Sequence, residues 1–453
     1  MISLFTALST VLVVSFCAYV TAIFIPFLRR QPERPGNPEQ FSWHLFIPCR
    51  DEGAVIETTI TRARERFPAA HVWIVDDDSD DDTAAIVLKH AHNDVHVHLV
   101  QRRRPHARVG KGAALNAAYA ALTTWLPPDV ERSSVIVCVL DADGEMAHNA
   151  FAAVSTDRVF GNPLVGAAQI TVWMKNRDDP TPLGDRGRFH NSFARLLIRM
   201  QDMEFRTMIV GMQALRERTS TVGLGGNGQF TRLSVLESIR RVYGEPWHGS
   251  LLEDYELGVH VLLAGYQTRH VDDTHVSQEA LTSVRRFLTQ RTRWSQGNIQ
   301  CAKYIRAIAS SPHFDTAGVI ESCYYLVLPF LQLLGFATWF VLFGAAVLQV
   351  STDGVAASNL DSPFASVISP IILFILFSIG PFAIWGPAYV ARCEPSKSFL
   401  SGLMYGVAMW LYVFYTYVSV SRAFLRVIFR RSGWAKTRRN AETSNSGPVA
   451  LEA

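Results

Sequence analysis

The sequence predicts an α/β protein with a mostly parallel sheet, joined to transmembrane α-helices. Two observations support this fold class. Short apolar runs alternate with helical patterns between Trp43 and Leu140, which is typical of a doubly wound parallel sheet. Long stretches without charged residues lie near the start of the chain and in its last third, and each exceeds the roughly 18–20 apolar residues that cross a bilayer.

The first uncharged stretch runs from Ser3 to Leu28 and is followed directly by Arg29 and Arg30. It is too long for the apolar core of a signal peptide and has no basic residues before it, so residues 1–30 are predicted to contain a transmembrane helix. Because basic flanks stay in the cytoplasm, we expect the N-terminus outside and the polar middle inside the cell.

The polar middle, residues 40–300, is predicted to be the α/β domain. The expected strands alternate with helices. The helices are predicted over 52–66, after Thr83 and over 111–122. The strands are 43–48, 71–75, 95–100 and 134–140. In such sheets, ligands bind at the carboxyl ends of the strands, so the residues that follow each strand are the candidates for chemistry.

Acidic residues follow two of these strands. Asp76 and Asp77 open "DDDSDDDT" (76–83), in which Asp80–Asp82 are explained equally well as a solvated, helix-capping turn. Asp141 and Asp143 lie in "DADG" after the fourth strand. Their i, i+2 spacing lets two carboxylates approach one hard cation such as Mg²⁺.

Several functional classes are excluded or weakened. The middle region has no GxGxxG or Walker loop, and Lys111 in "GKGAALN" instead starts a helix from which it can reach an anionic ligand. The six cysteines show no C-x-x-C spacing, which argues against a zinc module or a disulfide framework. A net charge of +3 is too small to indicate nucleic acid as a partner.

The last third of the chain contains three more uncharged stretches, predicted as transmembrane helices within 319–428. Four crossings would leave the basic tail, 429–453, outside, although basic segments prefer the cytoplasm. The sequence leaves open whether one late segment is a hairpin. Before these helices, residues 295–312 have a basic amphipathic pattern, which predicts a helix lying on the bilayer surface.

Histidines 90, 92, 96 and 98 could form a transition-metal cluster. We favour the alternative in which the first two end a helix and the last two alternate on the exposed face of a strand. The segment "RRRPHAR" (102–108) is compatible with a phosphate clamp or a solvated loop.

Seven short motifs, in the order in which they occur along the chain, resemble those of family 2 glycosyltransferases, which have the Rossmann-like GT-A fold. The resemblance is specifically to the membrane-integrated hyaluronan, chitin-oligosaccharide, poly-N-acetylglucosamine and cellulose synthases. The resemblance covers residues 43–300. Its motifs are "PCRDE" (48–52), "VDDDSDDDT" (75–83), "GKGAALN" (110–116), "DADG" (141–144), "GGNGQFTR" (225–232), "LLEDYELG" (251–258) and "QRTRW" (290–294). Asp51 and Asp78 depart from the family, which often has Asn at the first position and Gly or Asn at the second.

The resemblance implies a donor site. Asp77, with Asp76 beside it, would contact the uridine of a UDP-sugar, and Lys111 would lie near the nucleotide. Asp141 would approach the sugar and diphosphate, and Asp143, together with Asp141, would bind Mg²⁺ or Mn²⁺. A divalent metal stabilises the negative charge that develops on a diphosphate leaving group.

The resemblance also implies an acceptor site. Asp254 would be the general base, and its place at a helix start favours the ionised carboxylate that a base requires. The other implied acceptor-binding residues are Glu253, Gly226, Asn227, Gln290, Arg293 and Trp294, of which Arg293 could also bind the diphosphate. One base without a candidate covalent nucleophile indicates a single inverting displacement.

The predicted protein is therefore a multi-pass cell-membrane enzyme with a cytoplasmic catalytic domain. It would act as an inverting, processive β-glycosyltransferase that passes the growing glycan across the bilayer, alone, as a homo-oligomer or with accessory export subunits. One alternative is transfer of a single sugar to a lipid. Another is a receptor with a degenerate transferase domain, against which intact Asp141, Asp143 and Asp254 argue. The shared motifs do not identify the sugar.

Overall fold

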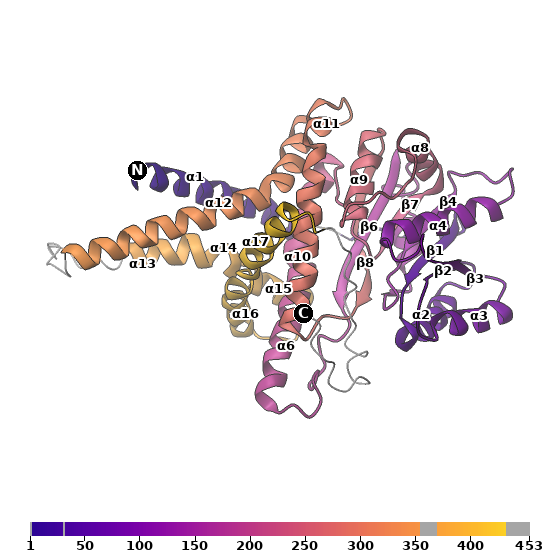
Figure 1. Cartoon of the computed structure of the whole chain (residues 1–453), viewed down its shortest axis with the longest axis horizontal. Coiled ribbons are helices and arrows are strands. Elements are labelled where there is room, and N and C mark those ends of the chain that lie inside the picture. The colour runs from indigo at the N-terminus through magenta and orange to yellow at the C-terminus, as the bar shows by residue number, and fades with distance from the viewer. Residues whose placement is uncertain (1, 30–31, 354–368, 432–453) are drawn as a thin grey trace.

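The computed structural model describes residues 2–29, 32–353 and 369–431. A domain built on one sheet lies on one side of the molecule, and long apolar helices extend from the other side (Figure 1). This arrangement confirms the predicted fold class. The six cysteines lie in the described ranges and are all free thiols.

The sheet has eight strands in the order β3-β2-β1-β4-β7-β6-β8-β5. The first four positions are parallel, because β1 pairs in parallel with β2 and β4, and β2 with β3. Strand β7 runs antiparallel to both neighbours, whereas β6 and β8 are parallel. The bounds are β1 Ser42–Cys49, β2 His71–Asp77, β3 Val97–Arg102, β4 Val135–Val139, β5 Glu145–Met146, β6 Val165–Met174, β7 Gln229–Arg232 and β8 Gln267–Gln278.

Helices cover both faces of this sheet because alternate strand residues point to opposite sides. Leu45 and Ile47 of β1 pack with Ile56 of α2, whereas Phe46 packs with Leu115 of α4. The helices of the domain are α2 Gly53–Arg66, α3 Thr83–Asn93, α4 Lys111–Trp125, α5 Ala150–Val154, α8 Leu233–Tyr243 and α9 Glu253–Leu263, with a short 3-10 helix η1 Pro38–Gln40 before β1.

The strands predicted from the sequence all lie in the parallel half of the sheet. The other half was missed, since β8 carries mostly polar residues and β7 is only four residues long. Also missed was a helical arm between β6 and β7. It consists of α6 Arg188–Met203, η2 Glu204–Ile209, α7 Val210–Arg216 and η3 Glu217–Thr219.

Four segments are long and apolar enough to span a membrane: Ser3–Leu28, Thr316–Ala345, Ile372–Cys393 and Phe399–Ile428. They coincide with the four uncharged stretches of the sequence. Most of the basic tail lies outside the described residues, so its predicted disorder and side of the membrane stay predictions. The helices are α1 Ile2–Leu28, α12 Thr316–Asp353, α13 Ser369–Phe374, η6 Ile375–Ile379, α14 Gly380–Ala383, α15 Trp385–Cys393, α16 Phe399–Tyr412 and α17 Tyr415–Ile428.

The segment 295–312 does not form a helix of its own. Helix α10 begins at Val284 and continues to Cys301, followed by η4 Ala302–Tyr304 and α11 Ile305–Ser310. Gln296, within the predicted surface helix, is buried and donates to the Arg431 backbone carbonyl at 2.8 Å. Oε1 of Gln296 also accepts from Nε of Arg426 on α17 at 2.7 Å, so this side chain binds α10 to α17. The predicted start at residue 295 thus falls inside α10.

The histidines pack rather than gather around a metal. His98 stacks on Trp73 with ring centroids 4.0 Å apart, and its Nε2 lies 3.0 Å from Nδ1 of His71. His90 and His92 are in the last turn of α3. Within the described residues no group of three or more His, Cys, Asp or Glu side chains could hold a metal ion.

Candidate active site

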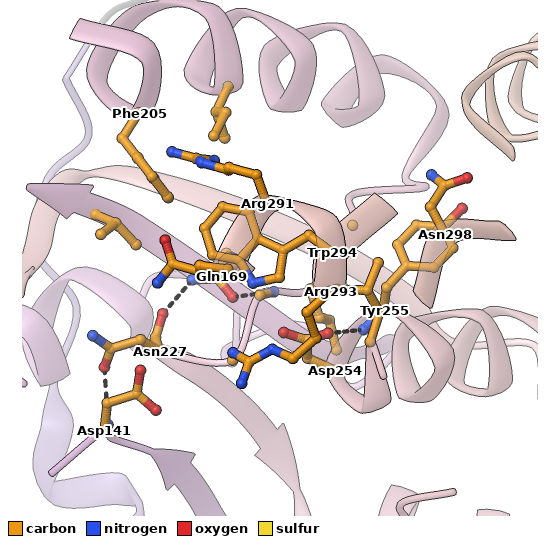
Figure 2. A pocket seen from close by; sticks show the side chains of 18 of the residues that line it. Asp141, Gln169, Phe205, Asn227, Asp254, Tyr255, Arg291, Arg293, Trp294 and Asn298 are labelled. Atoms are coloured by element: carbon orange, nitrogen blue, oxygen red, sulfur yellow. Dashed lines mark hydrogen bonds between the residues drawn. The ribbon is translucent and has the colours of Figure 1, made fainter. Parts of the chain in front are cut away.

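A cavity of about 500 Å³ begins at the carboxyl ends of the parallel strands and continues past α10 to a space between α12 and α17. Figure 2 shows part of its lining, with side chains from the sheet domain and from α10 facing one another. Most of the predicted site residues line it, whereas Asp76 and Asp143 do not. Those that do are Asp77, Lys111, Asp141, Gly226, Asn227, Glu253, Asp254, Gln290, Arg293 and Trp294.

The acidic loop after β2 is held by arginines. Arg102 donates to Oδ1 of Asp77, and the backbone N–H of Arg108 donates to Oδ2 of the same carboxylate at 3.0 Å. Arg103 donates to the buried Asp76 at 3.1 Å. The segment 102–108 therefore pairs with this loop, although Arg103 and Arg104 stay largely exposed to solvent. Burial raises the pKa of Asp77, and the charge of Arg102 opposes that rise.

Asp51 and Asp78, the two departures from the family pattern, both have left-handed backbone conformations, with φ of 53° and 63°. Asn, Asp and especially Gly tolerate this region. Oδ1 of Asp51 accepts from the backbone N–H of Asp80 at 2.8 Å. The aspartates thus meet the same backbone requirement that Gly or Asn would meet.

Lys111 lies at the centre of the donor end. Its Nζ donates to Oδ1 of Asp141 at 2.6 Å and to the backbone carbonyl of Gly226 at 2.8 Å. Burial alone would lower the pKa of Lys111, but the carboxylates of Asp141 and Glu253 outweigh it and raise that pKa. The ammonium group therefore stays charged beside Asp141.

Gln169 of β6, which was not selected from the sequence, orders the loop 225–227. Its Nε2 donates to the Asn227 carbonyl at 2.8 Å and its Oε1 accepts from the Gly225 N–H at 2.7 Å. The Asn227 side chain in turn accepts from the backbone N–H of Asp141 at 3.1 Å (Figure 2). A buried glutamine in an apolar strand is the only sequence signal for this role.

Asp143 lies behind the cavity wall with 2% of its surface exposed. Its Oδ2 accepts from the backbone N–H of Glu279 at 3.2 Å. The side chain of Asp141, two residues earlier, is 28% exposed and belongs to the cavity lining. The loop after β4 therefore presents one carboxylate to the cavity and holds the other against β8.

Glu253 and Asp254 occupy the first turn of α9. Burial raises the pKa of Glu253 to about 7, and the charge of Asp254 adds to the rise. Burial also raises the pKa of Asp254, whereas Lys111 opposes that change. A Cβ at Gly226 would lie 3.0 Å from Oδ2 of Asp254 and 2.8 Å from Nζ of Lys111, so only glycine leaves these two groups undisturbed.

Gln290, Arg293 and Trp294 line the cavity from one face of α10, as expected for i, i+3, i+4 spacing. In Figure 2 the side chain of Arg293 lies between Trp294 and Asp254. The Trp294 ring packs edge-on against Phe205, with centroids 6.1 Å apart. Gln290, Arg293 and Trp294 thus line the same cavity as Asp254, the base candidate.

Arg291, the first arginine of "QRTRW", was not selected from the sequence. Arg291 is buried and lines the cavity, and its guanidinium carbon lies 4.3 Å from the centroid of the Trp294 ring. Nη2 of Arg291 donates to Glu204 at 2.6 Å, and the hydroxyls of Tyr412 and Tyr415 each donate to Glu204 at 2.7 Å. This network holds the Arg291 guanidinium against the Trp294 ring and ties α10 to η2, α16 and α17.

The far end of the cavity is enclosed by helices from the apolar region. A buried pair, Arg216 Nε to Glu321 Oε1 at 2.7 Å, joins α7 to the start of α12. Most of the remaining lining here is apolar or aromatic. It consists of Ile209, Val210 and Met212, of Tyr325, Leu328, Pro329 and Gln332 on α12, and of Tyr415 and Val420 on α17.

Known proteins resemble this chain in sequence and in fold. A β-monoglucosyldiacylglycerol synthase of Synechocystis sp. is 24% identical over 89% of this chain and 76% of the relative. The probable glycosyltransferase YdaM of Bacillus subtilis is 23% identical, with 61% of this chain and 60% of the relative covered. A β-monoglucosyldiacylglycerol synthase of Trichormus variabilis is 27% identical over 56% of this chain, which spans about half (48%) of that relative.

Among solved structures, the mannosyltransferase PcManGT from Pyrobaculum calidifontis, in complex with GDP-Man and Mn²⁺, superposes with a TM-score of 0.53. The match covers 95% of this chain and 98% of that one at 15% identity, and it supports the GT-A fold. The family model described as "Glycosyltransferase like family 2" matches residues 41–297. The chain therefore belongs to glycosyltransferase family 2, and it is a glycosyltransferase.

Proposed function

We propose that this enzyme transfers one sugar from a nucleotide sugar to a hydroxyl group of a membrane lipid. The observation that carries the proposal is the continuity of one cavity, from Lys111 and Asp141 at the strand ends to Leu328 and Val420 between apolar helices. A lipid could place its head group beside Asp254 while its chains stay between α12 and α17. The names of the similar synthases from Synechocystis and Trichormus point in the same direction.

This proposal replaces processive synthesis as the preferred hypothesis. Of the similar proteins described above, two are named for the synthesis of a glycolipid that carries one glucose. The features that suggested a polymerase, Gln290, Arg293 and Trp294, are equally suited to a lipid-linked acceptor, because an indole stacks on a sugar or covers an apolar glycerol backbone. Polysaccharide export and accessory export subunits stay predictions.

The chemistry proposed for the site is one inverting displacement. Asp254 takes the proton of the acceptor hydroxyl as its oxygen forms a bond to the anomeric carbon of the donor. The bond from that carbon to the diphosphate oxygen breaks, and the electron pair leaves with the diphosphate. Of the cations that line the cavity, Lys111 and Arg293 are the ones proposed to stabilise the leaving group.

Asp141 and Asp143 are suited to a divalent metal. Both carboxylates are hard oxygen ligands on one loop, and Mg²⁺ or Mn²⁺ commonly completes its shell with substrate phosphates and water. Asp141 already lines the cavity, whereas Asp143 would have to turn from the Glu279 N–H to reach the same ion. When bound, such an ion supplies positive charge to the leaving diphosphate. We propose UDP as the nucleotide of the donor. Asp76 and Asp77 would form the part of the donor site that contacts its uridine.

We also propose a multi-pass cell-membrane protein whose sheet domain faces the cytoplasm. The four candidate spans and Arg29 next to the first of them support this orientation. Residues 40–300 would be the catalytic domain and 319–428 the membrane region.

Narrowing the membrane end of the cavity tests the proposal. Leu328→Trp places an indole in the lining between α12 and α17, whereas Leu334→Trp adds one to the exposed side of α12. We expect Leu328→Trp to reduce sugar transfer to lipid at least tenfold without weakening the binding of the nucleotide sugar. Leu334→Trp should behave like the wild type. Equal transfer by both variants would contradict entry of a lipid at this end.

A further inference from the structure

Helix α6 carries an exposed apolar stripe. Phe189 is 81% exposed, Phe193 51% and Leu196 42%. Their i, i+4, i+7 spacing puts them on one side of the helix, whereas Ala194 and Ile198 on another side are buried. One exposed apolar side chain needs no explanation, but two phenylalanines and a leucine in a row indicate a surface that is covered in the working protein.

Cations lie beside the stripe. Arg186, Arg188 and Arg195 are exposed, and Asp185 is the one exposed acid in the segment 184–196. On the helix, Arg188 and Arg195 are seven residues apart and so lie along one flank of the stripe. An apolar stripe flanked by arginines matches the boundary between acyl chains and anionic head groups.

The second half of α6 is fixed to the membrane region. Arg199 donates to the Tyr389 hydroxyl of α15 at 3.0 Å, and α6 packs against α16. In Figure 1, α6 runs across the direction of α1 and α12 and lies beside α16. Phe399 and Leu400 at the start of α16 are exposed apolar residues as well, so the stripe continues toward a candidate membrane span.

We propose that the stripe Phe189–Phe193–Leu196 of α6 lies in the interface of an anionic bilayer, with Arg188 and Arg195 at the head groups. The inference rests on the membrane placement in the proposed function. It assigns the surface helix to α6 instead of to residues 295–312, whose Gln296 is buried against α17. Because α6 leads directly into Glu204 and Phe205 of the cavity, this contact would also position the membrane end of the active site.

Quenching by brominated lipid tests this contact, because bromine on an acyl chain quenches a tryptophan that touches it. Full-length protein carrying Phe193→Trp is placed in vesicles of phosphatidylcholine and phosphatidylglycerol with or without bromine. The matched control is Val242→Trp, which alters a 71% exposed apolar residue on α8, far from the candidate spans. We expect loss of most of the added fluorescence for Phe193→Trp and none for Val242→Trp. Equal retention by both would overturn the proposal.

Two further quenching measurements show which part of the proposal is wrong if the expected result is not obtained. Trp339 is exposed on α12, so quenching of the wild type reports whether the candidate spans lie in the bilayer at all. If the wild type is quenched but the tryptophan added at position 193 is not, the contact of α6 with the bilayer is overturned while the membrane placement of the candidate spans stands. In the Phe193→Trp protein, Arg188→Glu with Arg195→Glu should reduce the quenching in anionic vesicles only. Unchanged quenching there would overturn the proposed head-group contact.

Discussion

The two ends of the cavity are built in different ways. At the donor end, Asp77, Lys111 and Asp141 follow consecutive strands of a parallel sheet, and each belongs to a short motif in the sequence. At the membrane end, Glu204 and Tyr412 meet across 208 residues of chain, and Arg216 and Glu321 across 105. The donor end is therefore encoded by short local motifs, whereas the membrane end depends on packing between residues far apart in the chain.

The largest effect is expected at Asp254. Asp254→Asn keeps the shape of the side chain but removes the proposed base, which typically contributes roughly 10²–10⁴-fold in rate. We expect that loss in transfer to lipid, with unchanged thermal unfolding. Asp129→Asn, an exposed aspartate in the loop after α4, is the control. If Asp254→Asn retains most of the activity, sugar transfer does not depend on Asp254 as the base.

At the membrane end of the cavity, the expected effect of a substitution is mainly a loss of protein stability. Arg291 is 4% exposed and paired with Glu204. Arg291→Met leaves that carboxylate buried without its cation, which costs about 3–5 kcal/mol in comparable buried pairs. The midpoint of thermal unfolding should fall strongly, and it should not fall for Arg285→Met on the exposed side of α10. Equal midpoints would mean that the network does not join α10 to the membrane helices.

The neighbouring glycines Gly225 and Gly226 test how closely the loop packs against Lys111 and Asp254. In Gly226→Ala the new Cβ would displace Lys111 or Asp254, whereas in Gly225→Ala it would make an ordinary contact of 3.5 Å with Gln169. Because a displacement of about 1 Å can cost about 10²-fold in rate, we expect a loss of that order for Gly226→Ala alone. Equal kcat/KM values for the two variants would refute close packing around position 226.

The smallest effect is a shift in pH dependence. Burial raises the pKa of Asp254, and the charge of Lys111 opposes that rise. The rate requires ionised Asp254, so it falls as the pH drops through the pKa of that group. Lys111→Met removes the opposing cation and should move the acidic limb of kcat/KM to higher pH. Lys89→Met, on the exposed surface, should leave the limb in place, and a limb that moves downward at position 111 would contradict this effect of Lys111.

The sequence was sufficient to predict the parallel half of the sheet, because β1, β2 and β4 are apolar runs that end in polar residues. Of the residues predicted for the donor site, Asp77, Lys111 and Asp141 line the cavity, because parallel strand ends meet at one edge, whereas Asp76 and Asp143 do not line it. The sequence could not predict Gln169, whose role depends on the loop 225–227 folding over β6. Nor could it predict that Gln296 is buried against α17 or that Phe189 and Phe193 of α6 are exposed, because burial in these segments depends on how α17 and α16 pack.

The chemical nature of the product tests the central claim most directly. Purified protein in vesicles of bacterial lipids is incubated with a radiolabelled nucleotide sugar and Mg²⁺ or Mn²⁺, and the label is divided between organic and aqueous phases. We predict metal-dependent label in the organic phase, on a lipid that carries a single sugar, and none with Asp254→Asn. Label in a water-soluble polymer would contradict the proposal and restore processive synthesis.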